Sequence, residues 1–209
     1  TQKKITQREN TKVQTKKPYV ILISIDGFRS DFTELHNASF LSQMSKKGVR
    51  AAYMTPSYPS STFPNHYSIV TGMYPSHHGL VDNSYYDATS NTNYSMNNKA
   101  IVGQGKWYGG TPLWVLAEQQ NMLSASFYWV GSEADIKGVR PTYYYVYNEK
   151  IQMAQRINAV KNWLSLPENI RPHLITFYLP QVDHEAHDYG PNDVKVYNAV
   201  QMVDSSINA

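Results

Sequence analysis

Three runs of mostly apolar residues, rich in β-branched or aromatic side chains, stand out along the chain, and each predicts a strand. They lie at 19–25, 123–129 and 173–179. The first and last are apolar at nearly every position, as in central strands of a parallel sheet that are covered on both faces. Segments with helical spacing separate the runs. This alternation predicts an α/β fold with a mostly parallel central sheet and helices on both faces.

Four segments have the features of helices: 39–48, 112–119, 151–164 and 194–207. The first ends at Gly48, a residue type that often terminates helices. The second follows Thr111 as a cap and places Pro112 at the first helical position. The other two carry apolar residues at intervals of three and four, which predicts one buried stripe on each. The polar, Asn-rich residues 82–104 are expected to form a long excursion and not a separate domain.

The two ends of the chain differ in character from its body. Residues 1–17 are rich in Lys and Arg, which predicts a flexible basic leader. Residues 18–209 are expected to form the N-terminal portion of one domain. The last predicted helix approaches Ala209 without a glycine, a proline or another stop signal. We therefore expect the domain to be truncated, with its C-terminal part missing.

Composition narrows the class of protein. The 209 residues are 41% apolar and 17% charged, which is typical of a globular domain. The formal net charge is +3, and the excess lies in residues 1–17, so we expect no nucleic-acid-binding surface. The chain has no cysteine, which excludes disulfides and thiolate metal sites. It has no apolar run of about 18 residues, so we expect no transmembrane segment.

An aspartate directly follows the first predicted strand. Asp26 comes after the apolar run and precedes Gly27. Ligands of open α/β sheets gather beyond the carboxyl ends of the strands, so Asp26 occupies a functional position. A simple turn formed by the Asp-Gly pair explains the same two residues equally well.

A carboxylate and imidazoles follow the last predicted strand. Asp183 and His187 are four residues apart, so on a helical turn they face the same side and can bind one cation. Carboxylate oxygen and imidazole nitrogen together suit zinc. Two rival pairs are present, His184 with His187 and His184 with Asp188, and a solvated polar loop is a further alternative. The two histidines are one residue too close for the metalloprotease motif His-Glu-x-x-His.

A threonine stands on a turn that favours nucleophilic chemistry. Thr62 precedes Phe63 and Pro64, and Pro64 is expected to keep Phe63 out of the helical conformation, which stiffens the turn. A hydroxyl at a helix start can attack phosphorus while nearby backbone N–H groups hold the developing negative charge. Taken alone, Thr62 is more simply a helix cap. Together with carboxylates that can hold an activating metal, it predicts metal-assisted phosphoryl transfer.

The chain from Pro18 onward resembles the nucleotide pyrophosphatase/phosphodiesterase family of the alkaline phosphatase superfamily. The likeness rests on short motifs in the family's order, at 25–29, 56–59, 62–67, 71–72, 74–75, 78–79, 83, 112–114, 131–132 and 183–191. The resemblance implies an alkaline-phosphatase-like fold, with residues 18–209 as the N-terminal portion of a catalytic phosphodiesterase domain. It also implies zinc-dependent hydrolysis of phosphodiester or pyrophosphate bonds.

The resemblance assigns roles to the residues around phosphorus. Thr62 matches the nucleophile, which forms a covalent phospho-threonine that water then hydrolyses. Asp26 and Thr62 match ligands of one zinc ion, whereas Asp183 and His187 match ligands of the other. The family supplies three further ligands from sequence beyond residue 209. We therefore expect two zinc ions in the full-length protein, and weak or absent zinc binding and no activity in this chain alone.

The resemblance also assigns substrate contacts. Asn83, which is uninformative taken alone, matches the amide that holds a phosphate oxygen together with the backbone N–H of Phe63. Phe63 and Tyr147 match the aromatic residues that sandwich a nucleobase, with core packing as the alternative for Tyr147. The expected partner is a small phosphodiester, either a nucleotide or a lipid headgroup, because an aromatic wall can stack on a purine or hold a choline. The position of Phe63 beside the nucleophile favours nucleotides.

Two other readings of the chain stay open. One is a phosphate monoesterase or sulfatase on the same scaffold, although Thr62 and the absence of cysteine disfavour a sulfatase. The other is a binding module that has lost the metals and holds a nucleotide or headgroup without turnover. Similarity to exported family members indicates the periplasm or the outside of the cell.

Overall fold

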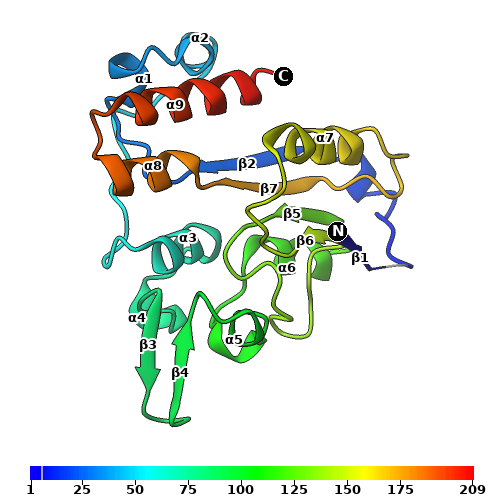
Figure 1. Ribbon diagram of the computed structural model, residues 1–209. Helices are drawn as coiled ribbons and strands as arrows, with labels where there is room; N and C mark the ends of the chain where they lie inside the picture. The colour runs from blue at the N-terminus through cyan, green and yellow to red at the C-terminus, as the bar shows by residue number, and fades with distance from the viewer. Residues whose placement is uncertain (6) are drawn as a thin grey trace. The chain divides into compact units, whose positions relative to one another are not determined.

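The computed structural model describes residues 1–5 and 7–209. Within them the chain forms a five-stranded sheet (Figure 1), in the order β1 (Gln2–Lys4), β6 (Tyr143–Tyr145), β5 (Ser124–Phe127), β7 (Leu174–Leu179) and β2 (Val20–Ile25). Strand β5 pairs in parallel with both β6 and β7, whereas β1 is antiparallel to β6. The predicted α/β fold, with a mostly parallel central sheet and helices on both faces, is confirmed.

Within the described residues, strand β2 ends the order of the sheet, whereas the sequence pattern predicted a central strand. It runs parallel to β7, because hydrogen bonds from Val20 N to His173 O (2.8 Å) and from Asp26 N to Leu179 O (3.0 Å) have the same offset in sequence. The side chains of Val20 and Ile21 are 52% and 41% exposed, whereas β7 is buried at every position, as predicted. An apolar run identifies a strand that suits a covered position, but it does not identify the neighbours of that strand.

The chain divides into two compact units. The first consists of Thr1–Leu22, Pro56–Asn148 and Asn162–Phe177, and the second of Ile23–Thr55, Glu149–Lys161 and Tyr178–Ala209. Strands β2 and β7 each contribute residues to both units, because one boundary falls after Leu22 in β2 and another after Phe177 in β7.

Besides strands of the sheet, the first unit contains short helices and a hairpin. It contains η1 (Gln14–Lys16), α3 (Thr62–Thr71), α4 (Pro75–His78), α5 (Lys99–Val102), η2 (Gly105–Trp107) and α6 (Leu113–Gln119). Residues 82–104, predicted as a long excursion, include the antiparallel hairpin of β3 (Ser84–Asp87) and β4 (Thr92–Ser95) (Figure 1). Helix α6 starts one residue later than predicted, because Pro112 has extended backbone angles and forms its N-cap.

Longer helices dominate the second unit. It contains α1 (Phe32–Leu35), α2 (Ser39–Lys47), most of α7 (Met153–Leu164), α8 (Gln181–Tyr189) and α9 (Val194–Ile207). The predicted helices at 39–48, 151–164 and 194–207 are confirmed. Asp204 of α9 is 4% exposed and accepts from the backbone N–H groups of Phe40 (3.0 Å) and Leu41 (2.8 Å). This carboxylate therefore caps the N-terminus of α2 from another helix.

Aromatic residues fill the core of the first unit around Phe127 of β5. The centroid of its ring lies 4.4 Å from that of Tyr145 in β6 and 5.7 Å from that of Phe177 in β7. Trp163, in the last turn of α7, lies 6.3 Å away. Such ring pairs contribute about 0.5–1.5 kcal/mol each beyond the burial of their area. Side chains therefore join the neighbouring strands in addition to the backbone ladder.

The segment predicted to be a flexible basic leader is built into the first unit. Strand β1 pairs with β6, and Asn10 is only 7% exposed. Its Oδ1 accepts from the N–H of Leu123 at 2.8 Å, and its Nδ2 donates to the carbonyls of Glu168 (3.0 Å) and Arg171 (2.8 Å). The sequence did not reveal this anchoring, because single polar side chains in a basic segment look the same whether they are solvated or paired.

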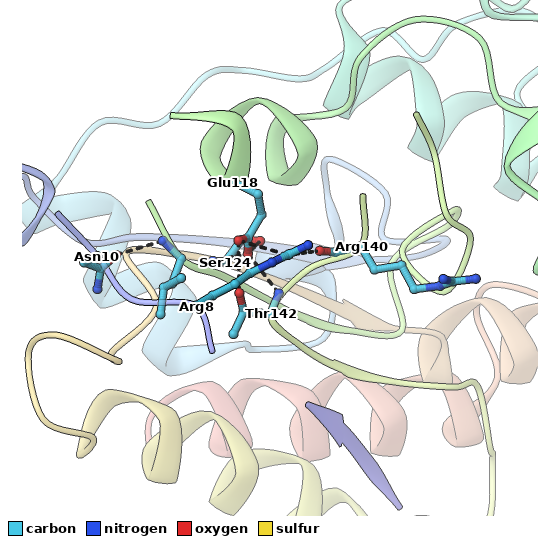
Figure 2. A network of polar contacts seen from close by, with 7 residues as sticks. Arg8, Asn10, Glu118, Ser124, Arg140 and Thr142 are labelled. Carbon is cyan, nitrogen blue, oxygen red and sulfur yellow. Dashed lines mark hydrogen bonds and ion pairs between the residues drawn. The ribbon is translucent and has the colours of Figure 1, made fainter. Parts of the chain in front are cut away.

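A buried carboxylate, Glu118 in α6, holds the same segment (Figure 2). Its side chain is 3% exposed. Its Oε1 accepts from the backbone N–H groups of Ser124 and Thr142, both at 2.8 Å, and from the Ser124 hydroxyl at 2.7 Å. Its Oε2 accepts from the Thr142 hydroxyl at 3.0 Å and from the Arg8 guanidinium at 3.2 Å. One side chain thus joins α6, the start of β5, the residue before β6 and the N-terminal segment.

Replacing Glu118 with glutamine should destabilise the protein by about 2–3 kcal/mol, because a donor amide would then face the Arg8 guanidinium in a buried position. Urea unfolding of Glu118→Gln beside the unaltered chain measures this free energy. The exposed Glu168 offers a matched control, and Glu168→Gln should change stability by less than about 0.5 kcal/mol. Equal stabilities for the two variants would contradict the assigned role of Glu118.

Candidate active site

In the second unit, the turn after β2 packs against α8. Gly27, which follows Asp26, has a φ of +66°, and a Cβ added to it would lie 2.7 Å from the Cα of Asp183. Both the left-handed backbone and the close approach require glycine. The structure therefore brings together two aspartates that the sequence placed after different strands.

The Asp26 carboxylate is held by a tyrosine that sequence reasoning missed. The hydroxyl of Tyr178 donates to Oδ2 of Asp26 at 2.7 Å, and the N–H of Gly27 donates to Oδ1 at 3.0 Å. Tyr178 is 6% exposed and lies in β7, in a run that the pattern identified only as core. The only available signal was a hydroxyl within this apolar strand, and the strand has two, on Thr176 and on Tyr178, the residue before its last.

Asp183 and His187 face the same side of α8, as their spacing predicted. Oδ1 of Asp183 lies 3.4 Å from Nε2 of His187. The side chain of His187 is 78% exposed, and that of Asp183 is 22% exposed. His184, which belongs to both rival pairs, is exposed on the same helix. Asp183 and His187 are therefore close enough to share one cation.

The chemistry of the Asp183–His187 pair fits zinc, which binds carboxylate oxygen and imidazole nitrogen. A catalytic zinc normally has three protein ligands. Across residues 1–5 and 7–209, no group of three or more His, Cys, Asp or Glu side chains is arranged to hold a metal ion. Asp183 and His187 would therefore supply two of the three protein ligands that a catalytic zinc normally has.

In the first unit, Thr62 is the first residue of α3 and follows Ser61 as N-cap. The expectation that Pro64 keeps Phe63 out of the helical conformation is wrong, since α3 includes both residues. Pro64 falls in the first turn, where a missing N–H costs no intrahelical hydrogen bond. Thr62 thus stands at the positive end of a helix of 10 residues.

Asn83 lies beside the first turn of α3. The backbone N–H of Phe63 donates to Oδ1 of Asn83 at 2.9 Å. Because Oδ1 is the acceptor, the Nδ2 group of Asn83 keeps two N–H donors to offer to an anion. This differs from the expected arrangement, in which the N–H of Phe63 and the amide of Asn83 both point to a phosphate oxygen.

The two residues predicted to sandwich a nucleobase each lie against another aromatic ring. The Phe63 centroid is 6.3 Å from that of Tyr94 in β4, and the Tyr147 centroid is 5.0 Å from that of Tyr128. Phe63 and Tyr147 are both half-buried. The hairpin therefore contributes an aromatic neighbour to Phe63 that sequence reasoning did not anticipate.

His78, at the end of α4, is another residue that sequence reasoning left without a role. It is 1% exposed, and burial lowers the pKa of its imidazole to about 4. Its Nδ1 accepts from the N–H of Leu80 at 3.2 Å, and its Nε2 lies 3.0 Å from the hydroxyl of Ser68 in α3. A neutral imidazole therefore joins α3 to the segment that leads to Asn83.

Comparison with known proteins decides the family. A family model described as type I phosphodiesterase / nucleotide pyrophosphatase matches residues 20–209. The chain belongs to this family. Ectonucleotide pyrophosphatase/phosphodiesterase family member 1 of Homo sapiens is 41% identical over 192 residues, which are 91% of the chain and 21% of that protein. The venom phosphodiesterase of Macrovipera lebetinus is 38% identical over 190 residues, which are 90% of the chain and 22% of that protein.

A solved relative within the phosphodiesterase family has the same fold. Murine ectonucleotide pyrophosphatase/phosphodiesterase 5 matches with a TM-score of 0.85 and 28% identity over 91% of the chain. The alkaline-phosphatase-like fold is therefore confirmed. The chain spans 50% of the length of this relative and 21% of the human protein. Among the residues that the structure describes, none of the helices has the length and apolar character that crossing a membrane requires.

The stability of the chain should fall in mild acid because of His78. Below pH 6.5 the unfolded imidazole binds a proton, whereas the folded one stays neutral until pH 4 is approached, so stability is lost as pH falls through this window. Between pH 7 and pH 5 the His78 imidazole should lower the free energy of unfolding by about 2 kcal/mol. Urea unfolding at both pH values, for the unaltered chain and for His78→Gln, isolates the contribution. Identical pH dependences would contradict it.

Proposed function

We propose that the chain forms the part of a zinc-dependent phosphodiesterase that carries the nucleophile, and that the whole protein hydrolyses phosphodiester or pyrophosphate bonds of nucleotides. The observation that carries the proposal is the placement of Thr62 at the N-terminus of α3, where the backbone N–H of the next residue, Phe63, donates a hydrogen bond to Asn83. Membership of the type I phosphodiesterase / nucleotide pyrophosphatase family supports it.

The Thr62 hydroxyl attacks phosphorus and loses its proton to solvent, and the alcohol or phosphate on the opposite side leaves with the bonding electron pair. The result is a covalent ester in which Thr62 carries the phosphoryl group together with the substituent that did not leave. Water then attacks the same phosphorus and releases Thr62 with its proton restored. The positive end of α3 and the Nδ2 donors of Asn83 stabilise the negative charge on the non-bridging oxygens in both steps.

Four residues would hold the metals. Asp26 and Thr62 would bind one zinc ion, and Asp183 and His187 would bind the other, with further ligands from outside this chain. When bound, the two ions supply positive charge to the attacking and leaving oxygens. Tyr178 would orient the Asp26 carboxylate through the hydrogen bond to Oδ2.

Nucleotides are the preferred substrate class in this proposal. Phe63 and Tyr147 would offer aromatic surfaces for base stacking, each supported by a neighbouring ring. A solved structure of murine ectonucleotide pyrophosphatase/phosphodiesterase 5, 27% identical with a TM-score of 0.85, is an inactive threonine-to-alanine variant in complex with AMP. The names of the ectonucleotide and venom relatives favour a location outside the cell.

Turnover of two nitrophenyl esters tests this function. The protein, extended to the length of its relatives and supplied with zinc, should hydrolyse the nitrophenyl ester of thymidine monophosphate at least 10-fold faster than nitrophenyl phosphate. Thr62→Ala should lower kcat by at least 1000-fold, because it removes the attacking oxygen. Thr71→Ala, at the other end of α3, should retain activity and is the matched control.

Each other outcome replaces the proposal with a specific alternative. Preference for the monoester would identify a phosphatase. Hydrolysis of a choline phospholipid without hydrolysis of the nucleotide ester would identify a lipid phosphodiesterase. Bound zinc or nucleotide without any turnover would identify a binding module.

A further inference from the structure

The buried imidazole of His78 closes a ring of contacts around the first turns of α3. Because Nδ1 accepts from the N–H of Leu80, the proton of the neutral imidazole is on Nε2, which lies 3.0 Å from the hydroxyl of Ser68. The imidazole also bonds to the backbone of Pro64 in the same helix. Ser68 lies on α3, five residues after Phe63. Leu80 is fully buried, three residues before Asn83. His78 therefore connects the helix that carries Thr62 to the segment that carries Asn83.

A second set of contacts fixes His78 itself. The N–H of Gly109 donates to the His78 carbonyl at 2.8 Å, and a Cβ at Gly109 would lie 2.7 Å from that oxygen. Tyr67 of α3 packs edge-on against the imidazole with centroids 5.0 Å apart, and its hydroxyl donates to the carbonyl of Gly109 at 2.9 Å. The imidazole is thus held between α3 and the chain around Gly109, and a shift of α3 along its axis would break several of these contacts.

The hydrogen bond from Phe63 N to Asn83 Oδ1 spans 2.9 Å and completes the ring. Its length depends on where α3 and the segment 79–83 lie relative to each other, and His78 bonds to both. We propose that His78 is a positioning residue that sets the separation between the first turn of α3 and Asn83, and so acts on turnover without touching the substrate. This inference rests on the proposed function, in which Thr62 and Asn83 act on one phosphoryl group.

The kinetic test uses three variants of the extended, zinc-loaded protein. His78→Leu removes the hydrogen bonds of the imidazole and keeps most of the volume, so kcat for the nitrophenyl nucleotide ester should fall at least 10-fold while KM changes less than about 3-fold. His78→Gln keeps a side-chain donor that can reach Ser68 and should recover part of this loss. His77→Leu changes the exposed neighbouring histidine and should leave both constants unchanged. A folded His78→Leu protein with kcat within 2-fold of the unaltered enzyme would overturn the proposal.

A structural readout separates failure of this inference from failure of the proposed function. The Phe63 amide should exchange with solvent at least 10-fold faster in His78→Leu than in the unaltered chain, whereas the amides of β7 should be unaffected. This measurement needs no enzymatic activity. If the unaltered protein were inactive, the proposed function would be contradicted, and the exchange rates would still test the positioning role of His78. Unchanged protection of the Phe63 amide would overturn the inference whatever the activity.

Loss of folding in His78→Leu would shift the test to Ser68→Ala, which removes only the hydroxyl that faces Nε2. This variant should lower kcat at least 3-fold and accelerate exchange of the Phe63 amide. A folded Ser68→Ala protein with both quantities unchanged would likewise overturn the proposal.

Discussion

The hydrogen bond between Phe63 N and Asn83 Oδ1 is the constraint on which the candidate nucleophile depends. It fixes the first turn of α3, at whose N-terminus Thr62 stands, and it orients the Asn83 amide so that Nδ2 can meet an anion. The geometry of this hydrogen bond is set by the packing of α3 against the segment 79–83. An uncharged, fully buried imidazole between those elements explains how a turn on a helix of 10 residues can be held in one position.

A different constraint governs the acidic residues of the second unit. Gly27 lets the chain after β2 approach the backbone of Asp183, where any side chain would collide. Tyr178 then holds the Asp26 carboxylate from the adjacent strand. The close approach at Gly27 and the hydroxyl of Tyr178 thus determine where the Asp26 carboxylate lies, without a metal ion.

Much of this arrangement could be predicted from the sequence, and the failures have physical causes. Periodicity located α9 and β7 because burial imposes a regular pattern, and the spacing of Asp183 and His187 predicted their common face. The same pattern does not give the order of strands, which places β2 beside β7 at the end of the described sheet. Roles that depend on a particular hydrogen-bond partner, and not on a repeating pattern, escaped entirely. Tyr178, His78 and Glu118 are examples, since each looks like an ordinary core or helix residue until its partner is known.

The central claim is that Thr62 becomes covalently bonded to phosphorus during turnover. Acid quenching of the extended, zinc-loaded enzyme during hydrolysis of a nucleotide ester, followed by peptide mass spectrometry, tests it most directly. The account predicts that the peptide containing Thr62 carries the nucleoside phosphate in the quenched sample and loses it once the substrate is exhausted. Modification of another residue, or sustained turnover with an unmodified Thr62 peptide at every quench time, would contradict it.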